Sequence, residues 1–209
     1  MLMHQALDYV LNNAEQNNPE SILKIIDEYV LKSGKFLMNV GPEKGKLLTK
    51  SLLNTRPKKV LELGTFLGYS AVLIAANIEN ESTLTTIDSD KNSIEIASKM
   101  LDFAGLINKV NLVHGAADKV LPSLNSKFQF VFIDHAKKKY LPDLELIEKN
   151  RLIESQSIVF ADNVGIFEDD MKNYFSHVRN SGKYTSQNIG STLEYRNNIY
   201  DAVEISVMN

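Results

Sequence analysis

The chain has 209 residues, of which 44% are hydrophobic and 23% charged, and its formal net charge is −3 at pH 7. This composition is typical of a globular protein, and the length fits one domain over residues 1–209 better than two. The sequence contains no run of Lys and Arg with interleaved aromatic residues, which disfavours nucleic acid as a partner. It also shows no signal peptide and no long apolar segment, so we expect no membrane association and a cytoplasmic location.

The N-terminal fifty-odd residues show helical spacing of their apolar side chains. Ala6, Val10 and Leu11 share one predicted helical face, and the apolar positions of residues 22–30 share another, in a helix that begins after Pro19. We expect these helices, within about residues 1–55, to pack on a core that is formed later in the chain.

The middle of the chain alternates short β-rich runs with helical stretches. The predicted strands are residues 59–64, 83–88, 110–115, 128–134 and 157–162. Residues 70–78 and 91–105 have the apolar spacing of crossover helices, and Gly105 is placed to end the second of them. The strands read as nearly continuous apolar runs, which is typical of a parallel sheet covered on both faces. This pattern predicts a doubly wound α/β fold, which the alternating tail, residues 197–209, closes as an antiparallel edge strand.

Acidic residues stand at or beside the ends of four predicted strands: Glu62, Asp88, Asp134 and Asp162. In doubly wound sheets, ligands bind beyond the carboxyl ends of the strands, near the point where the strand order reverses. A single acid in such a place can equally be a helix N-cap. Four together favour a binding site.

The segment after the first predicted strand carries Gly64 and Gly68, which allow a tight turn and the close approach of a ligand to a helix N-terminus. Because the third glycine of a dinucleotide fingerprint is missing, a pyrophosphate is disfavoured. Glu62 suits a cationic or zwitterionic group, Ser70 offers a hydroxyl group, and Asp88 is placed to accept hydrogen bonds from a ribose. These residues predict a nucleoside cofactor without phosphate; the alternative is a purely structural turn.

A second group of residues suggests a metal site. The chain contains no Cys, so any metal must be held by oxygen or imidazole groups. Asp134, Asp162 and Asn163 would offer three oxygen ligands from neighbouring strand ends, and such ligands suit Mg²⁺. The positions left open on the ion would suit a vicinal diol on an aromatic ring. The alternative is that Asp162 and Asn163 only form a turn after their strand.

Lys137 follows Asp134 closely enough to reach the same site, where it could accept a proton from a substrate hydroxyl group. Because Lys137 opens a run of three lysines, it could instead be ordinary surface charge. Glu194, a lone acid before the last predicted strand, carries no signal by itself.

Several motifs of the chain together resemble the catechol O-methyltransferase family. They are "MNVGPEKGKLL" at 38–48, "LELGTFLGYSAV" at 61–72, "MLDFAG" at 100–105, "DHAKKKYLPD" at 134–143, "ADNV" at 161–164 and "LEYR" at 193–196. The resemblance extends from about residue 4 to the last predicted strand. It implies a Rossmann-like fold and the transfer of a methyl group from S-adenosylmethionine to one hydroxyl group of a catechol, with Mg²⁺ bound at the site.

The resemblance also implies roles for individual residues. The implied cofactor-binding residues are Met38, Val40, Glu62, Gly64, Tyr69, Ser70, Asp88, Ser89, Ala117, Asp134 and His135. Asp134, Asp162 and Asn163 match the metal ligands. Lys137 matches the general base, and Glu194 matches the acid that receives the second substrate hydroxyl group. The implied substrate-contacting residues are Phe36, Met38, Lys137, Asn163 and Glu194.

The chain departs from the family pattern at its aromatic positions, because it contains no Trp. Phe36 stands where the mammalian enzymes have a gatekeeper Trp, and Ala136 stands where they have a Trp between the His and the Lys. Ala117 and Asp118 replace a Ser-Gln pair near the adenine. We therefore expect a more open adenine pocket or weaker cofactor binding, since buried apolar area is lost.

Three alternatives remain open at this point. The substrate could be a larger vicinal diol, such as a caffeoyl ester, a flavonoid or another natural-product catechol. The chain could be a binding domain without catalytic activity, although the metal ligands and the lysine are all present. An NAD-dependent oxidoreductase is disfavoured by the missing third glycine. The expected partner is a small molecule, and we expect a monomer while leaving a dimer open.

Overall fold

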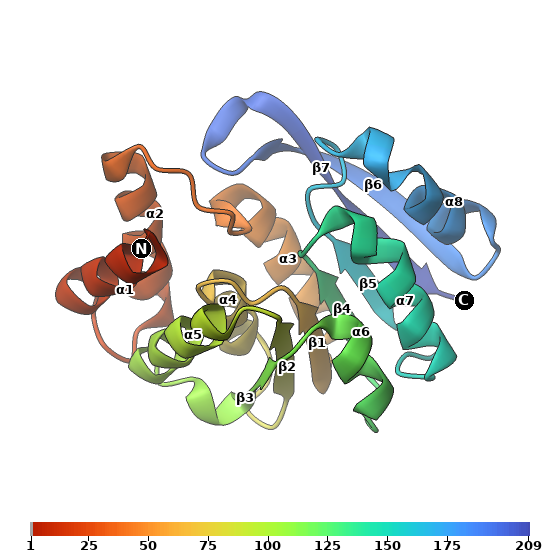
Figure 1. Ribbon diagram of the computed structural model, residues 1–209, viewed down its shortest axis with the longest axis horizontal. Coiled ribbons are helices and arrows are strands. Elements are labelled where there is room, and N and C mark those ends of the chain that lie inside the picture. The colour runs from red at the N-terminus through yellow and green to blue at the C-terminus, as the bar shows by residue number, and fades with distance from the viewer. Residues whose placement is uncertain (1) are drawn as a thin grey trace.

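The computed structural model describes residues 2–209, and its centre is a seven-stranded sheet with helices on both faces (Figure 1). The strands are β1 (Lys59–Leu63), β2 (Thr83–Asp88), β3 (Val110–His114), β4 (Phe130–Ile133), β5 (Ile158–Ala161), β6 (Tyr184–Leu193) and β7 (Arg196–Met208). Their order across the sheet is β3-β2-β1-β4-β5-β7-β6. The first five pair in parallel, and β7 runs antiparallel to both β5 and β6.

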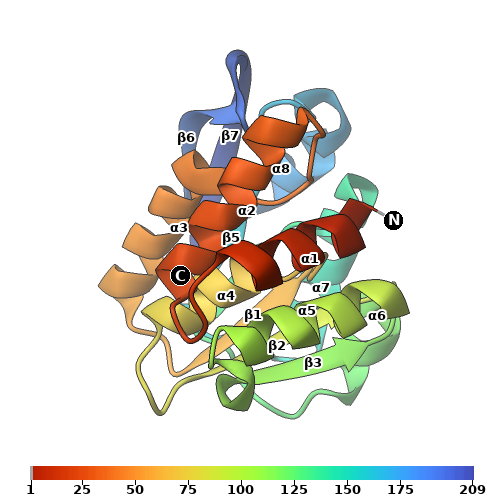
Figure 2. The same cartoon turned by 90° about the vertical axis from the view of Figure 1, so that its left-hand side faces the viewer.

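Helices form a layer on each face of this sheet. They are α1 (Leu2–Asn13), α2 (Pro19–Ser33), α3 (Gly41–Thr55), α4 (Tyr69–Asn77), α5 (Lys91–Phe103), α6 (Ala117–Val120), α7 (Tyr140–Lys149) and α8 (Lys172–Asn180). One face carries α3, α4 and α5, with α1 and α2 packed outside α4 and α5, and the other face carries α6, α7 and α8 (Figures 1 and 2).

The central strands are buried on both faces because their side chains alternate between two apolar layers. Val60 of β1 and Phe130 of β4 pack into the layer under α3, α4 and α5. Their neighbours Leu61 and Val131 pack into the layer under α7 and α8. This double burial explains why these segments read as continuous apolar runs in the sequence.

Local signals in the sequence fix the helix ends that we predicted. The side chain of Asn18 accepts a hydrogen bond from Ser21 N at 3.0 Å, and Pro19 occupies the first turn, so α2 begins where expected. The crossover helices are confirmed as α4 and α5. Gly105, with φ at +72°, follows the end of α5 in the left-handed conformation that glycine tolerates.

The doubly wound α/β fold with an antiparallel edge strand is confirmed, but three details differ from the prediction. The tail forms β7, which lies one strand in from the edge, and the edge strand is β6, which we did not predict. At the opposite edge, β3 is only partly buried, because no strand of the described residues pairs with its outer side. Leu11 is 41% exposed and does not belong to the buried face of α1.

Within residues 2–209, no helix is both long enough and apolar enough to cross a membrane.

Candidate active site

The strand order reverses between β1 and β4, because the chain proceeds outward from β1 to β3 and then returns to place β4 on the other side of β1. A cavity of about 500 Å³ opens next to this reversal, at the carboxyl ends of β1, β2, β3 and β4. Five predicted cofactor-binding residues line it: Gly64, Asp88, Ser89, Ala117 and His135. Ala136, which the family pattern replaces with Trp, lines it as well.

The two glycines after β1 are required by the close approach of the protein's own chain. A Cβ atom at Gly64 would lie 2.1 Å from the carbonyl oxygen of Asp134, and one at Gly68 would lie 3.1 Å from Cα of Ala97. Both glycines also have positive φ. These contacts show that the packing of Gly64 against the end of β4 and of Gly68 against α5 already requires glycine. Gly64 also borders the cavity, where a ligand could approach it closely.

Glu62 is fully buried and is the residue before the last one of β1, beside the strand end as predicted. Its Oε2 accepts a hydrogen bond from Thr86 Oγ1 at 2.5 Å, and its Oε1 has no hydrogen-bond partner among the described residues. Burial raises the pKa of Glu62 to about 8. An unpartnered buried carboxyl group of this kind is suited to receive a cationic ligand group.

Asp88 shapes the turn that encloses the cavity. Its Oδ2 accepts hydrogen bonds from Thr65 N at 3.0 Å and Phe66 N at 2.9 Å, and its Oδ1 accepts one from Asp90 N at 2.9 Å. Oδ2 thus uses both of its lone-pair sites, whereas Oδ1 can accept one more hydrogen bond. Asp88 therefore both holds the loop and faces the cavity, as a ribose-binding carboxylate would.

Lys137 lies at the centre of the second predicted group. Its Nζ is 3.2 Å from Asp134 Oδ1 and 3.2 Å from Asn163 Oδ1, and it donates to the hydroxyl group of Tyr140 at 2.6 Å. Its side chain is only 13% exposed, so the reading of Lys137 as ordinary surface charge does not hold. The oxygens of two predicted metal ligands thus converge on one positive charge.

Asp162 and Asn163 follow directly after β5. Asn163 has φ at +52°, a left-handed conformation that Asn tolerates, and its N–H donates to Asp162 Oδ1 at 2.8 Å. Asp162 is fully buried, and its Oδ2 has no hydrogen-bond partner within residues 2–209. Burial raises the pKa of Asp162 to about 7, although the ammonium group of Lys44 acts in the opposite direction. The turn exists, but it leaves one buried carboxyl oxygen free for a ligand.

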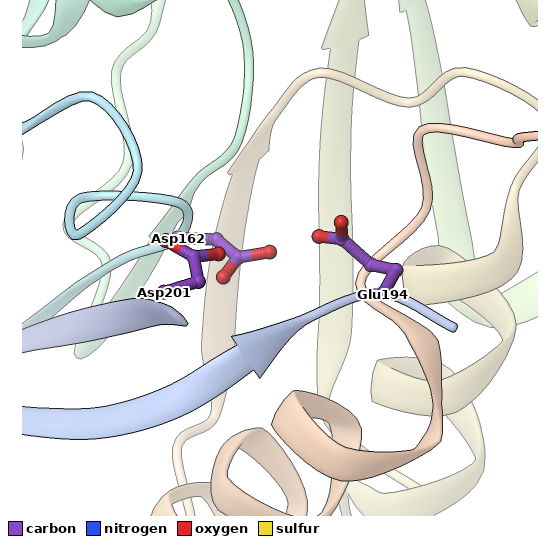
Figure 3. A group of neighbouring side chains, drawn as sticks. All are labelled: Asp162, Glu194 and Asp201. Atoms are coloured by element: carbon purple, nitrogen blue, oxygen red, sulfur yellow. The ribbon is translucent and has the colours of Figure 1, made fainter. Parts of the chain in front are cut away.

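Lys44 of α3 is a member of the site that sequence reasoning missed. Its Nζ pairs with Asp162 Oδ1 at 2.8 Å, Glu194 Oε1 at 2.5 Å and Asp201 Oδ2 at 2.7 Å. The carboxyl groups of these three acids are directed toward one another in Figure 3, and one oxygen from each lies within 4.8 Å of the others. Burial lowers the pKa of Lys44, but the three carboxylates outweigh burial and raise it. The acids therefore surround an ammonium group.

Glu194 follows directly after β6 and belongs to this cluster, where it also contacts Asn163. Asn163 Nδ2 donates to Glu194 Oε1 at 2.7 Å and to Asp201 Oδ2 at 2.9 Å. The structure thereby brings Glu194 next to the predicted metal ligands. Neither Asp201 nor Lys44 had a distinguishing sequence signal, since one lies in an ordinary alternating strand and the other in a helix among other lysines.

Other predicted residues lie outside the cavity at the switch point. Met38 is 67% exposed, while Val40 is buried. The ring of Phe36 lies 5.0 Å from the guanidinium group of Arg196. Tyr69 is buried, and its hydroxyl group donates to Asp27 of α2 at 3.3 Å rather than facing the cavity.

His135 is held beside the cavity by two contacts. Its Nε2 lies 2.7 Å from Asp143 Oδ2, and its ring stacks on Tyr140 with centroids 5.3 Å apart. Ser70, in the first turn of α4, is buried, and its hydroxyl group lowers the pKa of Glu62 by less than burial raises it. Asp134 lies between the two groups, because its carbonyl oxygen abuts Gly64 and its carboxylate contacts Lys137.

The fold and the site together define an α/β protein with a cavity at the switch point of a doubly wound sheet, the place where proteins of this class bind their ligands. A model of the O-methyltransferase family matches residues 13–188, and the chain belongs to this family. Catechol O-methyltransferase of Mus musculus is 34% identical over 206 residues, covering 96% of this chain and 76% of the relative. Catechol O-methyltransferase B of Danio rerio is 36% identical over 194 residues, covering 90% and 72%. These matches confirm the resemblance to the catechol O-methyltransferase family.

Solved structures share the fold. An O-methyltransferase from Streptomyces achromogenes involved in tomaymycin synthesis, in complex with SAM, superposes with a TM-score of 0.79 at 22% identity, covering 90% of this chain and 89% of that one. An O-methyltransferase from Bacillus cereus in complex with SAH gives a TM-score of 0.78 at 19% identity, covering 90% of each chain. At these identities the likeness establishes the fold alone.

Proposed function

We propose that the protein transfers a methyl group from S-adenosylmethionine to one hydroxyl group of a catechol, and that it requires Mg²⁺. The observation that carries this proposal is the convergence of Asp134, Asn163 and Lys137 beside the cavity at the switch point. The relatives named catechol O-methyltransferase support the choice of substrate.

In this proposal the cavity holds the nucleoside part of the cofactor. Asp88 would accept hydrogen bonds from the ribose, and Ala117 and His135 would border the adenine. Glu62, buried and with one oxygen unpartnered, would receive the positively charged amino group of the methionine part. Ala136 would leave open space at the adenine, so we expect weaker cofactor binding than in relatives with a Trp at this position.

The chemistry of the proposed ligands and two observations support Mg²⁺ as the ion. Asp134, Asp162 and Asn163 offer only hard oxygen donors. The unpartnered Oδ2 of Asp162 is an acceptor that lacks a cation, and two further oxygens already lie around the Lys137 ammonium group. A bound Mg²⁺ would stabilise negative charge on a substrate oxygen at neutral pH.

The chain's own residues would carry out the remaining steps. Lys137, in its neutral form, would accept the proton of the reacting hydroxyl group at Nζ. Glu194 would accept a hydrogen bond from the second hydroxyl group, which fixes the orientation of the ring. The deprotonated oxygen would then bond to the methyl carbon as the carbon–sulfur bond breaks, leaving the cofactor as a neutral thioether. Alignment of the two reactants would supply much of the rate.

The proposal is tested with purified protein, S-adenosylmethionine and a simple catechol. We expect product in the presence of Mg²⁺ and none in EDTA, and loss of activity in Asp134→Ala. Lys137→Met should lower kcat by about 10²–10⁴-fold because a general base is removed, with little change in cofactor affinity. Lys138→Met is the matched control, since Lys138 is the exposed neighbour in the same run of lysines. Unchanged turnover in EDTA, or in Lys137→Met, would refute the corresponding assignment.

A larger vicinal diol is the second candidate substrate. Phe167 is 40% exposed and its ring lies 5.8 Å from Lys137 Nζ, so it leaves apolar surface free near the site. A larger catechol could cover this surface. A panel of small catechols, caffeoyl esters and flavonoids, ranked by kcat/KM, separates the two candidates.

A further inference from the structure

Lys44 lies in α3 and is unusual because its whole side chain is buried: only 1% of the residue is exposed. Lysine is almost never buried unless its charge is paired. Here the ammonium group contacts three acids that come from three different segments: Asp162 after β5, Glu194 at the end of β6, and Asp201 in β7. One carboxylate would suffice to neutralise the lysine, so the arrangement does more than satisfy a buried charge.

Two of these three acids belong to the proposed reaction site. At Asp162, Lys44 contacts Oδ1, the oxygen that also accepts the Asn163 N–H, while the buried Oδ2 has no hydrogen-bond partner among the residues described. The lysine therefore occupies one side of the carboxyl group and leaves the other side for a ligand.

Glu194 depends on Lys44 even more directly. Its Oε1 is held by Lys44 Nζ at 2.5 Å and Asn163 Nδ2 at 2.7 Å. Without the ammonium group, only neutral donors, the Asn163 amide and the main-chain N–H groups of residues 163, 165 and 166, would face three buried carboxyl groups, one oxygen of each lying within 4.8 Å of the others. Such a cluster of hard oxygen donors would itself attract a divalent cation.

We propose that Lys44 is a positioning residue: it acts as a built-in cation that holds Glu194 and Asp162 in place and excludes divalent ions from the cluster of Asp162, Glu194 and Asp201. The inference rests on the proposed function, because it gives Lys44 the task of directing the ion to the Asp134 side of Asp162. Lys44 touches neither the cofactor cavity nor the reacting atoms, so its effect is exerted through the acids that it holds.

The test measures Mn²⁺ binding, by the loss of the free-ion electron paramagnetic resonance signal, in four proteins: wild type, Asp134→Ala, Lys44→Met, and the double variant. We expect Asp134→Ala to weaken Mn²⁺ binding at least about tenfold in the wild-type background. In the Lys44→Met background, the same change should have less than about a twofold effect, because the ion then binds among Asp162, Glu194 and Asp201.

Kinetics give an independent readout. Lys44→Met should lower kcat by about 10²-fold, since misplacement of a positioning group by about 1 Å has effects of this size, while the affinity for S-adenosylhomocysteine stays within about threefold. Lys44→Arg retains the charge in a larger group. It should keep the dependence of Mn²⁺ binding on Asp134 while kcat still falls, and it serves as the second variant if Lys44→Met does not fold.

The outcomes separate the two proposals. If Mn²⁺ binding depends on Asp134 equally with and without Lys44, and kcat per folded molecule is unchanged, Lys44 has only a structural role and the inference is overturned while the proposed function stands. A wild-type protein that neither binds Mn²⁺ nor methylates catechols would overturn both.

Discussion

At the scale of single residues, Glu62 shows how burial can prepare a group for its ligand. Its pKa of about 8, raised by burial, keeps the carboxyl group largely protonated at pH 7 in the free protein. A bound ammonium group would lower this pKa again and drive off the proton. We therefore expect cofactor binding at pH 7 to release close to one proton, and Glu62→Gln to abolish the release.

Isothermal titration calorimetry with S-adenosylmethionine in two buffers of different ionisation enthalpy measures this release. Equal proton release in the wild type and in Glu62→Gln would show that Glu62 does not receive the ammonium group.

The raised pKa of Glu62 also affects folding, because the unfolded chain loses this proton near pH 4.5 and the folded chain keeps it to about pH 8. The stability of the wild type relative to Glu62→Gln should thus fall as pH rises from about 4.5 to about 8.

Two lysines mark the limit of sequence reasoning at this scale. Lys137 could be predicted to lie near Asp134, since they are three residues apart and both follow a strand end. Lys44 could not, because its partner Glu194 lies 150 residues away and only the complete fold brings them together. Sequence periodicity identifies a buried position, but it does not identify the charge that compensates for a buried lysine.

At the scale of elements, an ion pair between a partly exposed arginine and a buried glutamate helps to hold α8 on the sheet. Arg179 of α8 donates through its Nε and one Nη to the two carboxyl oxygens of Glu204 in β7, each at 2.7 Å, and Glu204 is fully buried. Arg179→Ala would remove the cation from this buried carboxylate, but the arginine side chain is 39% exposed, so water screens the pair and the cost is on the order of 1–2 kcal/mol. For a chain of this size, we expect the Tm to fall by about 2–8 °C.

Thermal unfolding followed by circular dichroism checks this expectation. Lys172→Ala is the matched control, because the ion pair of Lys172 with Asp169 joins side chains that are 73% and 96% exposed and so contributes little. A similar Tm for both variants would mean that Asn188, which also donates to Glu204, compensates for the lost arginine.

The elements themselves were predictable to different degrees. The buried parallel strands could be predicted from their continuous apolar runs, and helix ends could be predicted from Pro19 and Gly105. β6 was missed because its sequence, YTSQNIGSTL, is mostly polar and only its two end residues are buried. Its pairing with β7 along the whole hairpin, rather than its own apolar pattern, makes it a strand.

At the scale of the whole molecule, the proposed site joins two halves of the sheet. Gly64, Asp88 and Ala117 line the cavity from the β1–β3 half, whereas Asp162 and Asn163 follow β5 in the other half. Asp134 lies between them, at the strand next to the reversal of strand order. The acids at the strand ends could be predicted to gather because parallel strands bring their carboxyl ends to one edge.

This division predicts that the cofactor binds independently of the ion. S-adenosylhomocysteine at about a hundred times its Kd should stabilise the fold by about 2.7 kcal/mol, or about 5–10 °C in Tm at this chain length. Because the cavity is lined without Asp162 or Asn163, the shift should persist in EDTA and in Asp162→Asn. It should be strongly reduced in Asp88→Asn, which loses a charged acceptor at the cavity. Differential scanning fluorimetry of the three proteins, with and without EDTA, measures it. A shift that disappears in EDTA would mean that the ion organises the cavity as well, and that the two halves act as one binding unit.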